Sequence, residues 1–198
     1  MSFGILFGVA AVIFLAELPD KSLIATLVLG TRYRASWVWF GVATAFLVHV
    51  VIAVAAGGAL ALLPHRLVEA IVSALFFIGA ALVLFSHEDD DEEEVEADAD
   101  QLRVGPSFGK VFLTSFTLIF IGEWGDITQI ATANYAAKYD DPLSVGIGAV
   151  LGLWLVSGLA VTVGARLLNH VPVLLLRRIT AVILLVFGVV SAVAAIRG

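Results

Sequence analysis

Four acidic residues lie inside long apolar stretches of this 198-residue chain, as two Glu-x-x-Asp pairs: Glu17 with Asp20, and Glu123 with Asp126. An ionised carboxylate near the centre of a bilayer costs at least about 2.5–3.5 kcal/mol on insertion scales, so each acid needs compensation. The spacing puts both acids of a pair on one helix face. Carboxylates that face one another repel, so the stable states hold a bound cation or protons. The pattern predicts an exchanger in which an entering divalent ion displaces protons and returning protons release it. The structural alternative is a network of these acids with Lys or Arg.

Oxygen donors accompany both pairs. Ser22 follows the first pair, and Thr128 and Gln129 follow the second. Carboxylates, hydroxyls, amides and backbone carbonyls suit Ca²⁺, Mn²⁺ or Mg²⁺. Zinc, copper and nickel fit poorly, because the chain has no cysteine and no clustered histidine. We predict these three residues as supporting groups, although a hydroxyl can also bond locally to a helix carbonyl. Lys21 would offset one negative charge in the first copy, where the second copy has Ile127.

Three further residues bear on the mechanism, two of them next to the acids. Pro19 lacks a backbone donor and Gly125 loosens the corresponding turn, so we expect both helices to be broken at the acids, with carbonyls free to bind an ion. His49 lies in the middle of another apolar stretch. It is either a proton relay or gate, or a histidine bonded to a neighbouring helix, and the sequence does not decide between these.

The composition excludes a soluble globular domain, since 61% of the residues are hydrophobic and 14% are charged. A membrane span needs about 20 apolar residues. Four stretches without Asp, Glu, Lys or Arg are about this long, and two longer stretches carry the acids near their middles. The sequence therefore predicts an all-α integral membrane protein with six transmembrane helices, at residues 1–31, 35–65, 70–87, 111–137, 142–165 and 179–196.

A charged segment divides the chain in two. Ten of the 17 acids lie at 88–100, and without them seven acids face 11 basic residues. We read 88–105 as a solvated linker between three-helix halves at 1–87 and 106–198, and nothing suggests a nucleic-acid partner. Shifting residues 14–26 by 106 positions superposes both acids on their counterparts. An odd number of helices in each half makes the two repeats inverted. The distribution of Lys and Arg places the linker in the cytoplasm and both termini outside.

The acid motifs resemble a known family. Residues 17–22 (ELPDKS) and 123–129 (EWGDITQ) are similar to the paired E-x-G-D-[KR]-[ST] motifs of the Gdt family of manganese/calcium transporters. The six helices, inverted halves and acidic linker extend the likeness over nearly the whole chain. The resemblance implies cation/proton exchange with Mn²⁺ or Ca²⁺ as substrate, and Glu17, Asp20, Glu123 and Asp126 as the binding acids. Pro19 and Ile127 depart from the motif.

Three other functions fit the sequence less well. An exporter of a cationic organic solute such as an amino acid would need fewer acids. An intramembrane aspartyl protease would carry Gly-x-Gly-Asp, whereas residues 122–126 read GEWGD. Buried titratable acids in inverted repeats favour alternating access over a channel. We therefore expect a multi-pass transporter that is not an enzyme and needs no cofactor, in the plasma membrane if the source is prokaryotic. It would export the ion in exchange for protons that return to the cytoplasm. The sequence is compatible with a homo-oligomer.

Overall fold

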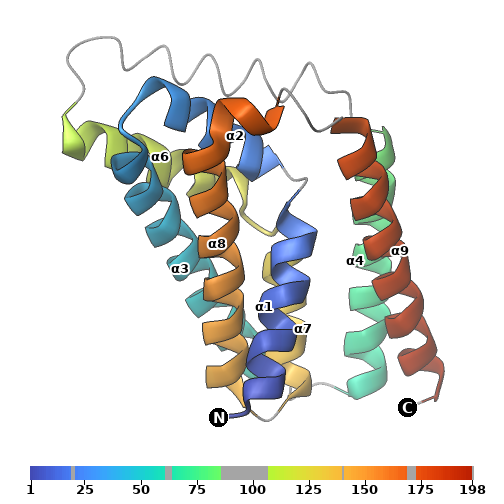
Figure 1. Cartoon of the computed structure of the whole chain (residues 1–198). Coiled ribbons are helices and arrows are strands. Elements are labelled where there is room, and N and C mark those ends of the chain that lie inside the picture. Colours follow the sequence, from blue (N-terminus) through green and yellow to red (C-terminus); the bar gives the residue numbers. More distant parts are fainter. Residues whose placement is uncertain (19–20, 61–63, 86–106, 140, 169–172, 198) are drawn as a thin grey trace.

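The computed structural model describes residues 1–18, 21–60, 64–85, 107–139, 141–168 and 173–197. Within these ranges the chain forms helices and no strand (Figure 1). The helices are α1 (Phe3–Glu17), α2 (Lys21–Arg32), α3 (Ala35–Leu60), α4 (His65–Phe85), α6 (Phe108–Gly122), α7 (Ile127–Lys138), α8 (Pro142–Leu168) and α9 (Val173–Arg197). The linker predicted at 88–105 lies outside the described residues.

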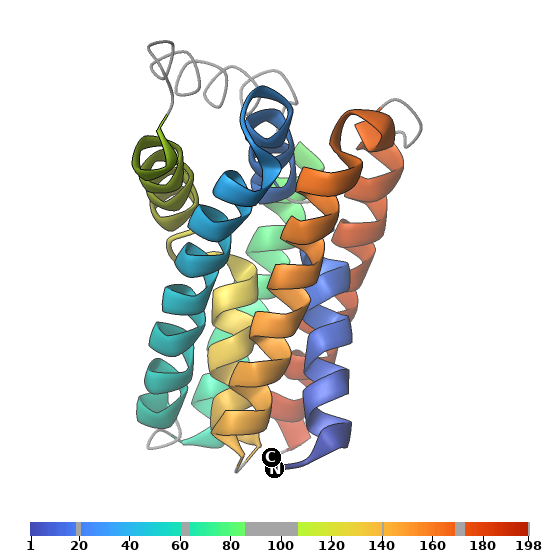
Figure 2. The ribbon, with the colours of Figure 1, turned by 60° about the vertical axis from the view of Figure 1, so that its left-hand side comes forward.

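Each half of the chain repeats one order of elements: a bent helix pair followed by two long helices. The axes of α1 and α2 differ by 74°, and those of α6 and α7 by 71°. Both predicted breaks at the acids are thereby confirmed. Figures 1 and 2 show that α1 starts at the end of the molecule that holds both marked termini, whereas α6 starts at the opposite end. The two bent pairs thus run in opposite directions.

The halves are interleaved. The long helix α3 of the first half packs against α6 and α7 of the second, and α8 of the second packs against α1 and α2 of the first. Glycine allows these helices to approach closely. A Cβ atom on Gly57 would lie 2.5 Å from the Ala133 carbonyl oxygen, and one on Gly148 would lie 2.4 Å from that of Leu6. The last helices of the two halves, α4 and α9, pack chiefly against each other.

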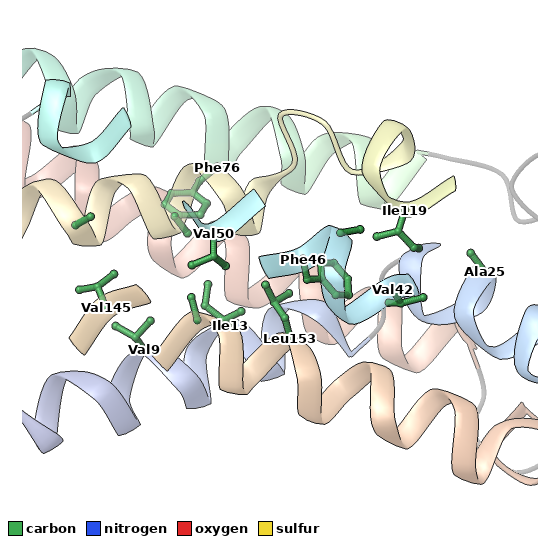
Figure 3. Packing of buried hydrophobic residues seen from close by; sticks show 14 of the residues in the cluster. Val9, Ile13, Ala25, Val42, Phe46, Val50, Phe76, Ile119, Val145 and Leu153 are labelled. Carbon is green, nitrogen blue, oxygen red and sulfur yellow. The ribbon is translucent and has the colours of Figure 1, made fainter. Parts of the chain in front are cut away.

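The main core lies where α3 and α8 meet the two bent pairs (Figure 3). Ile13 and Val42 are fully buried, and Ile119 is 1% exposed. Ala25 and Ala131, which the 106-residue shift superposes, both belong to this cluster. A second cluster joins α2 to α8. The bent pairs are therefore anchored in apolar packing next to their breaks.

The helices are those of an integral membrane protein. In the described part of the chain, α3 and α8 are long and apolar enough to cross a membrane, and the number rises to four if each bent pair counts as one span. Helices α4 and α9 have 21 and 25 residues but are not among these candidate spans. Six crossings thus stay a prediction. The predicted span at 179–196 lies within α9, which starts at Val173 and also includes Arg177 and Arg178.

Candidate cation site

The first acid pair lies where α1 ends. Glu17 is the last residue of α1, and its side chain has no exposed surface. The hydroxyl of Ser22, the second residue of α2, donates a hydrogen bond to the Glu17 carboxylate. Asp20 and Pro19 lie outside the described residues, and so does the side chain of Lys21. The structure therefore brings Ser22 to Glu17 as a supporting hydroxyl.

The second acid pair flanks the break between α6 and α7. Glu123 caps the C-terminus of α6, donating its backbone N–H to the Ile119 carbonyl at 2.9 Å, and is 4% exposed. Asp126 caps the N-terminus of α7 and accepts hydrogen bonds from the Thr128 backbone N–H and hydroxyl, both at 3.0 Å. A side-chain acceptor at this position satisfies donors that the first helical turn leaves free. Asp126 is therefore held in one orientation by Thr128.

Gly125 makes this turn possible. Its φ of +78° is left-handed, a conformation that glycine adopts without the cost a Cβ atom would bring. Its N–H donates to the Gln129 Oε1 atom at 2.8 Å, so Gln129 closes the turn from inside α7. At the end of α6 the Ile119 carbonyl accepts from the Glu123 N–H and the Ile121 carbonyl from the Trp124 N–H, so both oxygens already have donors.

A small cavity lies beside the second pair. Its walls come from α3, α8 and the start of α7, and are formed by Phe46, His49, Val50, Glu123, Thr128, Gln129, Thr132 and Leu153. Its volume of about 10 Å³ is close to the least that holds one water molecule. Residues with a carboxylate, an amide and two hydroxyl groups thus line a cavity of about the size of one water molecule.

His49 belongs to this cavity. Its Nε2 atom lies 3.1 Å from the Phe120 carbonyl oxygen, which can only accept, so Nε2 carries the proton in this contact. The ring also meets Phe120 and Trp124 edge-on, with centroids 5.1 and 5.9 Å apart. The sequence left two interpretations of His49 open. The bond to a neighbouring helix is present, and His49 also lines the cavity at the candidate site.

The hydroxyl residues behave differently from one another. Thr132 donates to the Thr128 carbonyl at 2.7 Å, which is local bonding within the helix. Thr128 instead donates to Asp126. Burial, in contrast, is similar at the positions that the 106-residue shift superposes. Ser22 and Thr128 are 2% and 8% exposed, and Thr26 and Thr132 are both 1% exposed. The two copies of the motif thus match in burial, whereas Ser22 donates to Glu17 and Thr128 to Asp126.

Convergence of the four acids is not tested by this structure. Among the residues it describes, no three acids or histidines lie close enough to hold one metal ion. Asp20, one of the four, lies outside that set. The shared four-carboxylate site stays a prediction.

Sequence reasoning missed Glu69. The span predicted at 70–87 leaves Glu69 just outside it, but Glu69 lies inside α4, is 1% exposed, and places its Oε1 atom 3.8 Å from the Lys138 ammonium nitrogen. The signal that could have found it is Pro64, because proline favours the start of a helix and so predicts that α4 begins before Glu69.

These features define a class: helical membrane proteins whose bent helices carry buried acids at the breaks. A family model described as "Divalent cation/proton antiporter GDT1" matches residues 5–91 and 111–198. The chain belongs to this family of cation/proton antiporters. The predicted resemblance and the exchange of a divalent cation for protons are thus confirmed, and the family is one of transporters, which is not an enzyme class.

Individual relatives agree with the family. "GDT1-like protein sll0615" of Synechocystis sp. is 28% identical over 90% of this chain and 92% of its own length. "GDT1-like protein 5" of Oryza sativa is 30% identical over 91% and 90%. A Vibrio cholerae protein named "Putative manganese exporter" is 30% identical over 90% and 85%. No solved structure matches the chain.

Proposed function

We propose that this antiporter exports Mn²⁺ or Ca²⁺ from the cytoplasm in exchange for protons, and that Glu17, Asp20, Glu123 and Asp126 bind the ion and carry the protons. The observation that supports this most directly is the cavity at the second break, where a buried carboxylate meets hydroxyl and amide oxygens. Oxygen ligands of this kind suit hard divalent ions. The printed name of the Vibrio cholerae relative makes Mn²⁺ the first ion to test.

The proposed architecture is six transmembrane helices in two inverted three-helix repeats. Three observations support it: the repeated order of elements, the opposite directions of the bent pairs, and the matching burial at superposed positions. Inverted repeats place a substrate site near the midplane, between the halves. In this arrangement the two breaks would face one binding site.

The exchange follows from charge. A divalent ion that enters the site displaces protons, because the acids cannot stay charged and unneutralised in a low-dielectric interior. Ser22 and Thr128 orient Glu17 and Asp126, and Gln129 holds the turn between Glu123 and Asp126. Lys21 would reduce the negative charge of the empty site. Protons that return down an inward gradient then release the ion on the far side.

The setting completes the proposal. The chain would be a multi-pass protein of the plasma membrane if prokaryotic, with the 88–105 segment in the cytoplasm and the termini outside. Its partners would be the ion, protons and the lipid bilayer, with no resident cofactor and no nucleic acid. A homo-oligomer is compatible with this scheme.

The test is uptake into proteoliposomes. The purified chain is reconstituted, a pH gradient is imposed, and entry of Mn²⁺ and of Ca²⁺ is followed for the parent, Glu123→Gln and Asp126→Asn. We expect both variants to lose most of the gradient-driven uptake. Asp141→Asn, which neutralises a carboxylate outside the site, should transport like the parent. Undiminished uptake in both site variants would remove these acids from the mechanism, and inhibition by a cationic amino acid would favour the organic-solute alternative.

A further inference from the structure

Helices α4 and α9 contact each other more extensively than they contact the rest of the bundle, although α4 also contributes buried residues to the main core. α4 and α9 pack along each other and touch the rest of the bundle mainly where α4 meets α7 and α9 meets α1 (Figure 1). The Ser73 hydroxyl donates to the Gly188 carbonyl at 2.8 Å and ties the two helices together. Two helices joined in this way can move as one unit against the remaining bundle.

An apolar groove of about 340 Å³ separates α4 from α3 and α7. Its α4 wall includes Val68 and Val72, and its opposite wall includes Ala53 and Ala133. Trp124 and Gln129, next to the second acid pair, also line it. A movement of α4 would therefore change access to the candidate cation site.

One ion pair joins the two walls of this groove. Glu69 follows Val68 in α4 and is 1% exposed, whereas Lys138 is the last residue of α7 and its side chain is 40% exposed. The charged atoms are 3.8 Å apart. Tyr135, one turn before Lys138, is close enough to Glu69 to interact with it electrostatically.

We propose that the Glu69–Lys138 ion pair is a latch, which holds the α4–α9 pair against α7 at the end of the molecule where the termini lie and which opens to expose the groove. The two residues are positioning residues and do not contact the ion. The inference rests on the proposed function, since a latch has a purpose only if the site opens in turn to each side. A pair with one partly exposed partner is weak enough to open.

The absence of cysteine from the chain allows a direct test. Ala133→Cys, on the groove wall, provides a single thiol, and its reaction with a small charged maleimide is timed in lipid nanodiscs. Glu69→Gln and Lys138→Gln should each speed the reaction about fivefold, the upper range for a partly exposed pair. The charge exchange Glu69→Lys with Lys138→Glu should restore the parent rate.

A matched reporter separates opening from general loosening. Ala45→Cys places the thiol in α3 at a position with no exposed surface, in the core away from the groove. Its reaction should stay at the parent rate in all three backgrounds. The latch would be refuted if the thiol at position 133 reacted at the parent rate in both single variants. It would also be refuted if the rate at position 45 rose equally, or if the exchanged pair did not restore the parent rate. Because labelling needs no ion movement, its failure would leave the cation/proton exchange standing.

Discussion

Replacing Gly57 by alanine tests the interleaved packing of the two halves. The new methyl carbon would lie 2.5 Å from the Ala133 carbonyl oxygen and 2.7 Å from the Ala136 methyl carbon. Ordinary contacts start at 3.4 Å, so α3 and α7 must separate by about 0.9 Å, the difference from 2.5 Å. Overpacking of this kind costs about 1–3 kcal/mol.

The adjacent Gly58 gives a matched control, because a Cβ atom there meets nothing within 4 Å. Both substitutions gain the same helix propensity, about 0.5–1 kcal/mol, so this gain cancels when the two variants are compared. Gly57→Ala should therefore be less stable than Gly58→Ala by about 1–3 kcal/mol. Gly58→Ala should be slightly more stable than the parent.

Thermal unfolding of the purified protein in one detergent measures this difference. Mn²⁺ uptake should fall along with the unfolding midpoint in Gly57→Ala, because α7 also carries Thr128 and Thr132 of the site. Equal midpoints for the two variants would show that α3 does not contact α7 at this glycine, and the packing described above would be wrong.

Three further predictions concern single side chains. Asp126→Asn should keep the free energy of unfolding within about 0.5 kcal/mol of the parent, since Asn caps a helix as well as Asp, whereas Asp126→Ala should cost about 1 kcal/mol. Chemical denaturation distinguishes the two variants, and equal losses of stability would refute the capping role. Hydrogen bonds from the Ser144 hydroxyl and N–H lower the pKa of Asp141 to about 2. Its stabilising contribution should be complete above the usual carboxyl pKa of about 4 and disappear as the pH falls through about 2, so unfolding midpoints measured against pH should lose this component in Asp141→Asn. His49→Phe keeps an aromatic ring but loses the bond to its carbonyl acceptor in α6, which should cost about 1 kcal/mol in the same denaturation assay.

The sequence predicted the local features of the site well, because they follow from single residues. Pro19 and Gly125 mark the positions where helices must end, and α1, α2, α6 and α7 end or begin beside them. The 106-residue shift superposes Glu17 on Glu123, and both side chains are buried.

Helix ends and helix partners were harder to predict. Counting charge-free residues placed Glu69 outside a span, although a helix can extend through a charged residue that has a partner of opposite charge, as Glu69 has in Lys138. The sequence also did not show which apolar helix packs against which. The packing partner of a helix depends on the shape of its surface, such as the close contact at Gly148. Composition does not reveal this shape, because it is nearly equally apolar in every helix.

The exchange of packing partners between the halves has a consequence for biogenesis. When the ribosome has finished only α1 to α4, α3 still lacks the helices that fill its glycine surfaces, because α6 and α7 have not been synthesised. Neither half expressed alone should then reach its native tertiary structure, whereas the two halves made as separate polypeptides in one cell should assemble with each other.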